Sequence, residues 1–177
     1  MTAGRSSRGD KNKDWNTPQK YVDLILEFFD NEIDLDPCSN EYSILPASLQ
    51  IMPPENGLSQ NWNCDKIYVN PPYGRCSLSK TSIKDWFIKV RDTRDQYGGE
   101  ILMLVPVATN TSHWKECVFN HASSICFLND TRLKFLKDGK LCKKGCPMAC
   151  CIIYYGDNLD KFHNVFKSSG NILNVTR

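Results

Sequence analysis

The sequence predicts an α/β fold with a mainly parallel sheet. Short apolar segments at 33–36, 66–69 and 100–105 alternate along the chain with helical patterns at 17–29 and 79–94. Strands that alternate with helices are typical of a parallel sheet covered by helices. The segment EILMLV at 100–105 is apolar at all but its first position, which indicates a strand buried on both faces.

The first helix is expected to begin at Thr17 and Pro18, as the N-cap and the first helical residue. The apolar residues of its buried face recur at helical spacing and are Tyr21, Leu24, Ile25, Phe28 and Phe29. The stretch 39–62 carries turn signals, PPENG among them, and is expected to hold only a short helix near Ala47.

The second half of the chain continues the alternation of strands and helices. A helix near 113–120 precedes an apolar strand at 124–128. The segments RLKFL at 132–136 and ACCIIYY at 149–155 are expected to be strands joined by a basic, hairpin-like loop, and therefore antiparallel. A last helix is expected over 159–167.

Composition indicates one packed domain. The chain has 177 residues, of which 41% are hydrophobic and 11% aromatic, which argues against disorder. We interpret residues 1–14, which lack an apolar core, as a disordered polar tail and not a secretory signal. Residues 15–177 are then expected to form a single domain. No segment approaches the roughly 20 apolar residues that cross a membrane.

The nine cysteines are expected to be thiols, because a chain without a secretory signal folds in a reducing compartment. The expected location is intracellular, in the cytoplasm or nucleus of a host. Cys142, Cys146, Cys150 and Cys151 cluster in sequence, but their spacing lacks the paired C-x2-C of zinc ribbons. Thiols are favoured there over a structural zinc ion, and no metal ligand is predicted.

Charge is divided unevenly along the chain, although the net charge is only +2. Residues 15–65 hold one basic and nine acidic side chains, whereas residues 66–144 hold fourteen basic and seven acidic ones. This asymmetry suggests that two ligands of opposite charge bind on different walls of the protein.

The most specific motif is Asn70-Pro71-Pro72-Tyr73, directly after the apolar strand 66–69. Ligands of open α/β sheets bind outside the carboxyl ends of the strands. The prolines remove backbone donors and hold the preceding residues extended, so the Asn70 amide oxygen and the Pro71 carbonyl become two fixed acceptors beside the Tyr73 ring. This arrangement fits a planar heterocycle that carries an NH2 group. A proline-rich turn is the alternative from the tetrapeptide alone.

N-P-P-Y after a buried strand resembles the catalytic signature of S-adenosylmethionine-dependent amino-methyltransferases, most of which act on adenine N6. The order of the other motifs is similar to that of phage-type DNA N6-adenine methyltransferases, a compact Dam-like family. These motifs are WNTP at 15–18, DLDPCS at 34–39, NGL at 56–58, LVP at 104–106 and RLKF at 132–135. The resemblance covers residues 15–155 and implies a compact Rossmann-like methyltransferase sheet, mainly parallel with an antiparallel late hairpin.

The resemblance also implies which residues contact S-adenosylmethionine. Carboxylates suit its positive sulfonium and amino groups, and Asp34 and Asp36 lie two apart on one strand, on the same face. Asp36 is expected near the methionine end, and Asp34 is expected to assist. The other expected cofactor contacts are Thr17, Pro18, Pro37, Cys38, Asn56, Gly57 and Leu58. The alternatives are solvated acids for Asp34 and Asp36, a helix cap for Thr17 and Pro18, and a plain turn for residues 56–58. The turn after Asp36 lacks the glycine usual in such enzymes.

Two basic segments are candidates for binding nucleic acid. Residues 75–94 hold six basic and two acidic side chains, and residues 132–144 hold six and one. A solvated helix face is the alternative for the first segment. The second includes Lys137-Asp138-Gly139-Lys140, which is expected to cap a hairpin. The predicted contacts are Arg75, Lys80, Arg132, Lys134, Lys140, Lys143 and Lys144.

The main hypothesis is therefore a DNA adenine-N6 methyltransferase with Asn70, Pro71, Pro72 and Tyr73 as catalytic residues. The target base must leave the stack to reach the pocket. Another acceptor amine (cytosine N4, RNA adenine or a protein amide) and an inactive nucleic-acid-binding module are the alternatives. DNA is the expected partner, with no membrane, and a partner protein or homodimer is possible for target recognition.

Overall fold

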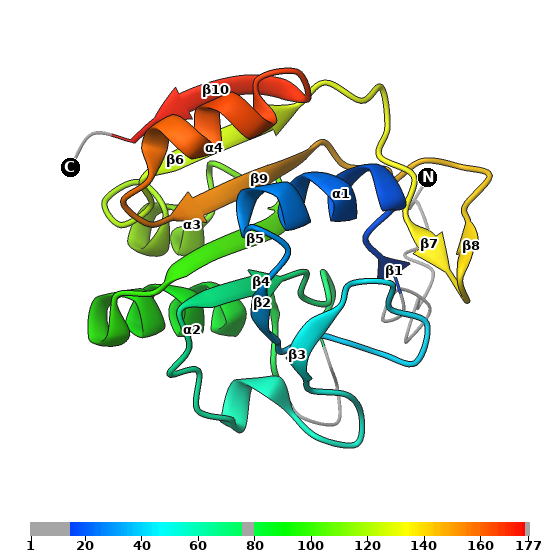
Figure 1. The fold of residues 1–177 in the computed structure, drawn as a ribbon, viewed down its shortest axis with the longest axis horizontal. Coiled ribbons are helices and arrows are strands. Elements are labelled where there is room, and N and C mark those ends of the chain that lie inside the picture. The colour runs from blue at the N-terminus through cyan, green and yellow to red at the C-terminus, as the bar shows by residue number, and fades with distance from the viewer. Residues whose placement is uncertain (1–14, 76–79, 176–177) are drawn as a thin grey trace, which may run out of the picture.

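The computed structural model describes residues 15–75 and 80–175. The predicted tail 1–14 lies outside these residues. The strands of the main sheet are β2 (Ile33–Asp36), β3 (Ala47–Gln50), β4 (Lys66–Val69), β5 (Glu100–Pro106), β6 (Ser124–Leu128), β9 (Cys150–Tyr155) and β10 (Gly170–Asn174). They lie in the order β10-β6-β9-β5-β4-β2-β3 (Figure 1).

Most of the sheet is parallel, as predicted. Strands β3, β2, β4 and β5 are parallel to one another. Strand β9 is antiparallel to both β5 and β6, and β10 is antiparallel to β6. The expected α/β class and its antiparallel late strand are confirmed, although β9 pairs within the main sheet and not with residues 132–136.

Helices cover both faces of this sheet (Figure 1). One face carries α1 (Gln19–Phe28) and α4 (Leu159–Phe166), and the other carries α2 (Ile83–Tyr97), α3 (Ser112–Cys117) and the short 3-10 helix η1 (Gly57–Ser59). Along β5, Leu102 and Leu104 pack toward α1, whereas Met103 and Val105 pack toward α2. Alternating residues thus enter two separate cores, which explains the unbroken apolar run of this strand.

A second, three-stranded sheet stands beside the main one. It consists of β7 (Leu136–Lys137) between β1 (Trp15–Asn16) and β8 (Lys140–Leu141). The expected hairpin is present, since β7 and β8 pair antiparallel. Its turn residues Asp138 and Gly139 have φ of 50° and 71°, as a two-residue turn between antiparallel strands requires. The predicted strand 132–136 was wrong: the chain reaches strand geometry only at Leu136.

Two further expectations were wrong. Residues near Ala47 form β3 and not a helix, because pairing with β2 satisfies their backbone and overrides local turn signals. The N-cap of α1 is Pro18 and not Thr17, and no side chain caps that helix. The predicted start of the second helix, residue 79, lies outside the described residues. The observed helix α2 begins at Ile83, and the backbone N–H of its N-cap residue Ser82 donates to the Asp85 carboxylate.

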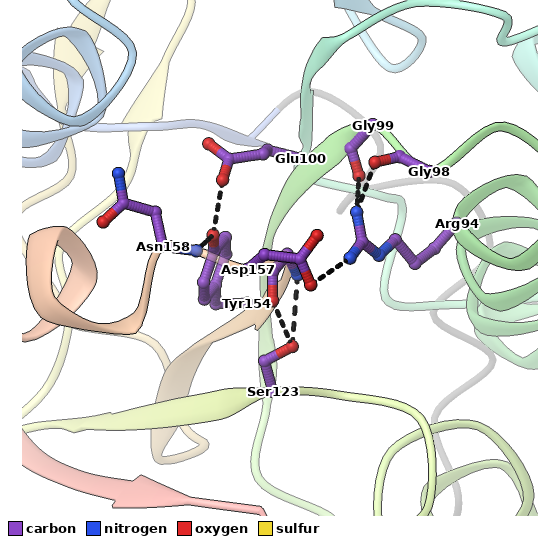
Figure 2. Close-up of polar contacts among 9 residues, drawn as sticks. Arg94, Gly98, Gly99, Glu100, Ser123, Tyr154, Asp157 and Asn158 are labelled. Atoms are coloured by element: carbon purple, nitrogen blue, oxygen red, sulfur yellow. Dashed lines mark hydrogen bonds and ion pairs between the residues drawn. The ribbon is translucent and has the colours of Figure 1, made fainter.

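A closed polar network fixes the amino end of β5 (Figure 2). Arg94 donates to Asp157 at 2.6 Å and to the carbonyls of the two glycines that follow α2. The Tyr154 hydroxyl donates to Glu100 at 2.7 Å and accepts the backbone N–H of Asn158 at 2.8 Å. These bonds join α2, β5 and β9 at the end of the sheet opposite the candidate site.

Candidate active site

The predicted site residues meet where the carboxyl ends of β2 and β4 lie side by side. Asp36 is the last residue of β2, and Asn70 directly follows β4. Strand β3, the next strand after β2 in the chain, pairs with one edge of β2, and the following strand β4 pairs with the opposite edge of β2. The strand order therefore changes direction at β2. Such a change of direction in an open α/β sheet is where ligands bind.

The amide of Asn70 is held by the N-terminal segment. Its nitrogen Nδ2 donates to the Trp15 carbonyl oxygen at 2.9 Å and lies 3.4 Å from Thr17 Oγ1. Its oxygen Oδ1 has no hydrogen-bond partner within residues 15–75 and 80–175, and it is not among the fully buried atoms. The amide therefore presents an acceptor that the described residues leave open.

Tyr73 is half-buried in an aromatic group. Its ring stands at 88° to Trp15 and at 77° to Phe135, with centroids 6.4 and 5.8 Å away. Its hydroxyl donates to the Leu104 carbonyl oxygen at 3.3 Å. Burial raises the pKa of Tyr73 well above its usual value, so the side chain is a neutral aromatic wall at physiological pH.

The segment 15–18 contacts both parts of the site, the Asn70 side chain after β4 and the turn after β2. The side chains of Asn16 and Asn40 exchange two hydrogen bonds of 2.9 Å, which ties β1 to the turn after β2. Thr17 is buried, and its hydroxyl lies 2.6 Å from that of Tyr68. This contact replaces the helix cap that the sequence suggested for Thr17.

Asp36 is a buried carboxyl group at the end of β2, with 5% of its surface exposed. Its Oδ1 accepts the backbone N–H of Cys38 at 2.9 Å. Burial raises the pKa of Asp36 to about 7, and hydrogen bonds from Cys38 and Ser39 only partly oppose this. Burial and the Asp36 charge also raise the pKa of the Cys38 thiol. No ion pair with Asp36 occurs in the described part of the chain.

The loop 56–58 packs directly against the turn after β2. A Cβ atom on Gly57 would collide with the Pro37 carbonyl oxygen, so this close approach requires glycine. Asn56 accepts the Leu58 N–H at 3.1 Å, and the buried Trp62 indole donates to the Gly57 carbonyl at 2.8 Å. The fold thus brings together the predicted residues of 36–38 and 56–58.

Asp34 lies apart from these residues. Its carboxylate accepts the backbone N–H groups of Asp65 and Lys66, at 3.0 and 2.8 Å, where β4 begins. The alternation that puts Asp34 and Asp36 on one face does not put them at the same end of the sheet. Asp34 therefore has a structural partner at the opposite end of β4 from Asn70.

The two basic segments differ in how their charges are used. In the first, Lys84 pairs with Glu116, Arg94 pairs with Asp157 and Lys89 donates to a backbone carbonyl. Its predicted contacts Arg75 and Lys80 are exposed.

In the second segment the predicted contacts are exposed, and no ion pair within the described residues involves Arg132, Lys134, Lys140, Lys143 or Lys144. The hairpin also adjoins the site. Trp15 pairs with Lys137 in the small sheet, and its ring stacks on Phe135 with centroids 5.4 Å apart. The same two rings contact Tyr73. The basic hairpin and the N-P-P-Y motif are therefore neighbours.

The cysteines of the described part are all free thiols, as expected. Within residues 15–75 and 80–175 no three His, Cys, Asp or Glu side chains gather as metal ligands would. Burial raises the pKa of Cys150, and its hydrogen-bonded neighbour Cys146 adds to the shift.

Several groups that hold the site residues in place were not predicted from the sequence. These are the Trp15 carbonyl, Asn16 and Asn40, and Tyr68. For Tyr68 a signal existed, since it lies two residues before Asn70 on the same strand and alternate side chains share a face. The others depend on contacts between distant segments.

No helix among the described residues is long and apolar enough to cross a membrane. In a comparison with known families, the model described as DNA N-6-adenine-methyltransferase (Dam) matches residues 5–171. A protein of Haemophilus phage HP1 (strain HP1c1), named DNA N-6-adenine-methyltransferase, is 24% identical over 138 residues, which is 78% of this chain and 74% of that protein. No solved structure matches.

The family match includes every motif on which the resemblance was based and confirms it. It also confirms the expected enzyme class, an adenine-specific DNA methyltransferase. This chain belongs to the DNA N-6-adenine-methyltransferase (Dam) family.

Proposed function

We propose that this protein transfers a methyl group from S-adenosylmethionine to the N6 amine of adenine in DNA, with Asn70, Pro71, Pro72 and Tyr73 as its catalytic residues. The observation that carries the proposal is the Asn70 amide. Its nitrogen is committed to Trp15 and Thr17, so its oxygen is the atom left to accept a hydrogen bond from a substrate. The NH2 group of a base donates hydrogen bonds, so the group that binds it has to be an acceptor.

The target amine donates one hydrogen to Asn70 Oδ1 and the other to the Pro71 carbonyl oxygen, which has no hydrogen-bond partner in the described part of the protein. When bound, S-adenosylmethionine would supply the methyl group and keep the electrons of the broken carbon–sulfur bond as a neutral thioether. The nitrogen that takes up the methyl group becomes positive and then releases one proton to solvent. Two fixed acceptors stabilise that charge without reorganising, which is the main source of catalysis that such a site offers. The Tyr73 ring stacks on the base.

The residues near Asp36 fit S-adenosylmethionine by their chemistry. Asp36 is a buried carboxyl group without a cationic partner among the described side chains, and its raised pKa reports the cost of that isolation. A positive group beside it removes this cost. S-adenosylmethionine supplies the activated methyl group on such a positive sulfonium. Thr17, Pro18, Pro37 and Cys38 and the loop 56–58 complete the proposed cofactor site.

DNA contacts are proposed on the basic hairpin and at Arg75 and Lys80. The hairpin is preferred, because its lysines form no ion pair with any described residue and it adjoins the aromatic group around Tyr73. The adenine leaves the duplex to reach Asn70. The order of the main sheet is compatible with a Rossmann-like methyltransferase domain over residues 15–177. A partner protein or a homodimer stays possible for target recognition.

The test is methyl transfer from tritiated S-adenosylmethionine to duplex DNA, single-stranded DNA and RNA, followed by nucleoside analysis, with Asn70→Ala as the inactive control. The expected product is N6-methyladenine from DNA. Label in N4-methylcytosine, in RNA alone or in the protein would contradict the proposed substrate. Binding of DNA without transfer to any acceptor would instead indicate an inactive nucleic-acid-binding module.

A further inference from the structure

Two buried hydroxyl groups lie beside the Asn70 amide. Tyr68 Oη and Thr17 Oγ1 are 2.6 Å apart, and Asn70 Nδ2 lies 3.4 Å from Thr17 Oγ1. Thr17 and Tyr68 are only 5% and 1% exposed, so bulk water does not replace either hydroxyl. The group is therefore a chain of polar atoms that begins in the core and ends at the site.

The amide has a preferred orientation within this chain. An asparagine side chain carries two N–H donors on its nitrogen and none on its oxygen. The Trp15 carbonyl can only accept, so turning the Asn70 amide over would place two acceptor oxygens against each other. With the nitrogen held by Trp15 and Thr17, the oxygen is directed away from both.

We propose that Thr17 and Tyr68 are positioning residues, which hold the Asn70 amide so that its oxygen faces the target amine. This inference rests on the proposed function of Asn70. Thr17 acts on Asn70 directly, and Tyr68 acts through Thr17. Neither residue touches the reacting atoms.

The local structure explains how these residues meet. Tyr68 and Asn70 are two apart along β4 and its continuation, so their side chains leave the strand on the same side. Thr17 is freed from helix capping, because Pro18 is the N-cap of α1. Burial, together with the nearby Asp36, raises the pKa of Tyr68, so its hydroxyl keeps its proton and can donate to Thr17 at neutral pH.

The experiment compares four variants of the full chain: Thr17→Val, Thr17→Ser, Tyr68→Phe and the double variant Thr17→Val/Tyr68→Phe. For each, kcat and KM are measured with an adenine-containing duplex, S-adenosylhomocysteine affinity by calorimetry, and Tm by thermal unfolding. The double variant is the decisive one. Removing both partners of a buried hydrogen bond leaves no unpaired hydroxyl, whereas removing one leaves the other without a partner.

Positioning predicts that Thr17→Val lowers kcat roughly fivefold to tenfold, as expected for the loss of one neutral hydrogen bond. KM for DNA stays within about twofold, since the contact acts through Asn70. In Tyr68→Phe the affinity for S-adenosylhomocysteine also stays within about twofold, because Tyr68 lies outside the proposed cofactor site and reaches Asn70 only through Thr17. Thr17→Ser restores kcat, because it restores the hydroxyl. In the double variant Tm recovers toward the wild-type value, while kcat stays low.

A purely structural role predicts the opposite, with kcat recovering together with Tm in the double variant. That result, or a Thr17→Val enzyme with wild-type kcat, overturns the inference. Asn70→Ala is assayed beside these variants. If Asn70→Ala is inactive but Thr17→Val has normal kcat, only the positioning inference fails. If Asn70→Ala keeps normal turnover, the proposed function of Asn70 fails first.

Discussion

Polar side chains gather at both ends of the main sheet, but the two groups differ in how their hydrogen bonds are completed. At the amino end of β5, Arg94, Tyr154 and Glu100 bond to partners within the same network (Figure 2). At the carboxyl ends of β2 and β4, the Asn70 oxygen has no partner in the described structure, and Asp36 is buried without a cation.

The difference separates stability from function. A closed network satisfies every buried polar group and so stabilises the fold. An open one keeps an acceptor and a carboxyl group available to a ligand, at a cost in stability. We therefore propose that the carboxyl end of the sheet is the functional end, so changes at the two ends should affect different measurements.

The largest expected effect is that of Asn70→Ala on catalysis. Loss of a positioned polar group that acts on the transition state costs about 100-fold or more in kcat. The substitution also removes the hydrogen bond from Asn70 Nδ2 to the Trp15 carbonyl, so Tm should fall only by the amount that one lost hydrogen bond costs, about 1 kcal/mol. The matched control is Asn63→Ala, an exposed asparagine, which should retain wild-type turnover. A large fall in Tm with Asn70→Ala would place this residue with the structural group instead.

Asp36→Asn should weaken cofactor binding. A hydrogen bond to a charged group is worth about 1.5–3 kcal/mol, or roughly 10- to 100-fold in affinity. Calorimetry with S-adenosylhomocysteine at pH 8 measures this. The wild-type affinity should rise as pH increases through about 7, where Asp36 ionises, and this rise should vanish in Asp36→Asn. An affinity that is unchanged by the substitution removes Asp36 from the proposed cofactor site.

The same carboxyl group should make stability depend on pH. Its pKa is raised in the folded state, so the native protein holds a proton that the unfolded chain releases. Its contribution to stability is therefore present at low pH and is lost as pH rises toward about 7. Asp36→Asn should reduce the fall in Tm between pH 5 and pH 8. An identical fall in both proteins contradicts a buried, uncompensated Asp36.

A smaller effect is expected from the second basic segment, residues 132–144, which includes the hairpin. Lys143→Ala/Lys144→Ala should flatten the slope of log affinity for DNA against log salt by up to about two units, roughly one for each lost phosphate contact. The control is Lys115→Ala/Lys167→Ala, which removes the same charge from exposed positions on and after other helices. Equal slopes in the two double variants would indicate that this segment is basic only for solubility.

The smallest effect on activity is expected at the closed end of the sheet. Tyr154→Phe keeps the ring but removes the hydroxyl that bonds Glu100 and Asn158. The unpaired groups should cost about 1–3 kcal/mol, which for a chain of this size lowers Tm by roughly 2–4 °C per kcal/mol. Turnover below the unfolding transition should not change. A selective loss of kcat would show that the two ends are coupled.

Much of the fold followed from local patterns. The strands at 33–36, 66–69 and 124–128 have the bounds predicted for them. Short apolar or alternating segments between turn signals leave few other ways to bury those apolar side chains. The pattern failed near Ala47, where the edge strand β3 has no buried residue. Its structure comes from pairing with β2, which no local signal encodes.

The candidate site, like the fold, has some features that local sequence patterns predict and others that they do not. Local sequence was enough to predict that the N-P-P-Y motif follows a buried strand and that its two prolines make it stiff. The available atom of Asn70 could be identified only in the folded chain, since the partners of its nitrogen are 53 and 55 residues away. The tertiary structure also separated Asp34 from Asp36 and set the basic hairpin beside Tyr73. The physical reason is that hydrogen bonds depend on direction and on partners from distant segments, whereas burial of apolar side chains follows local periodicity.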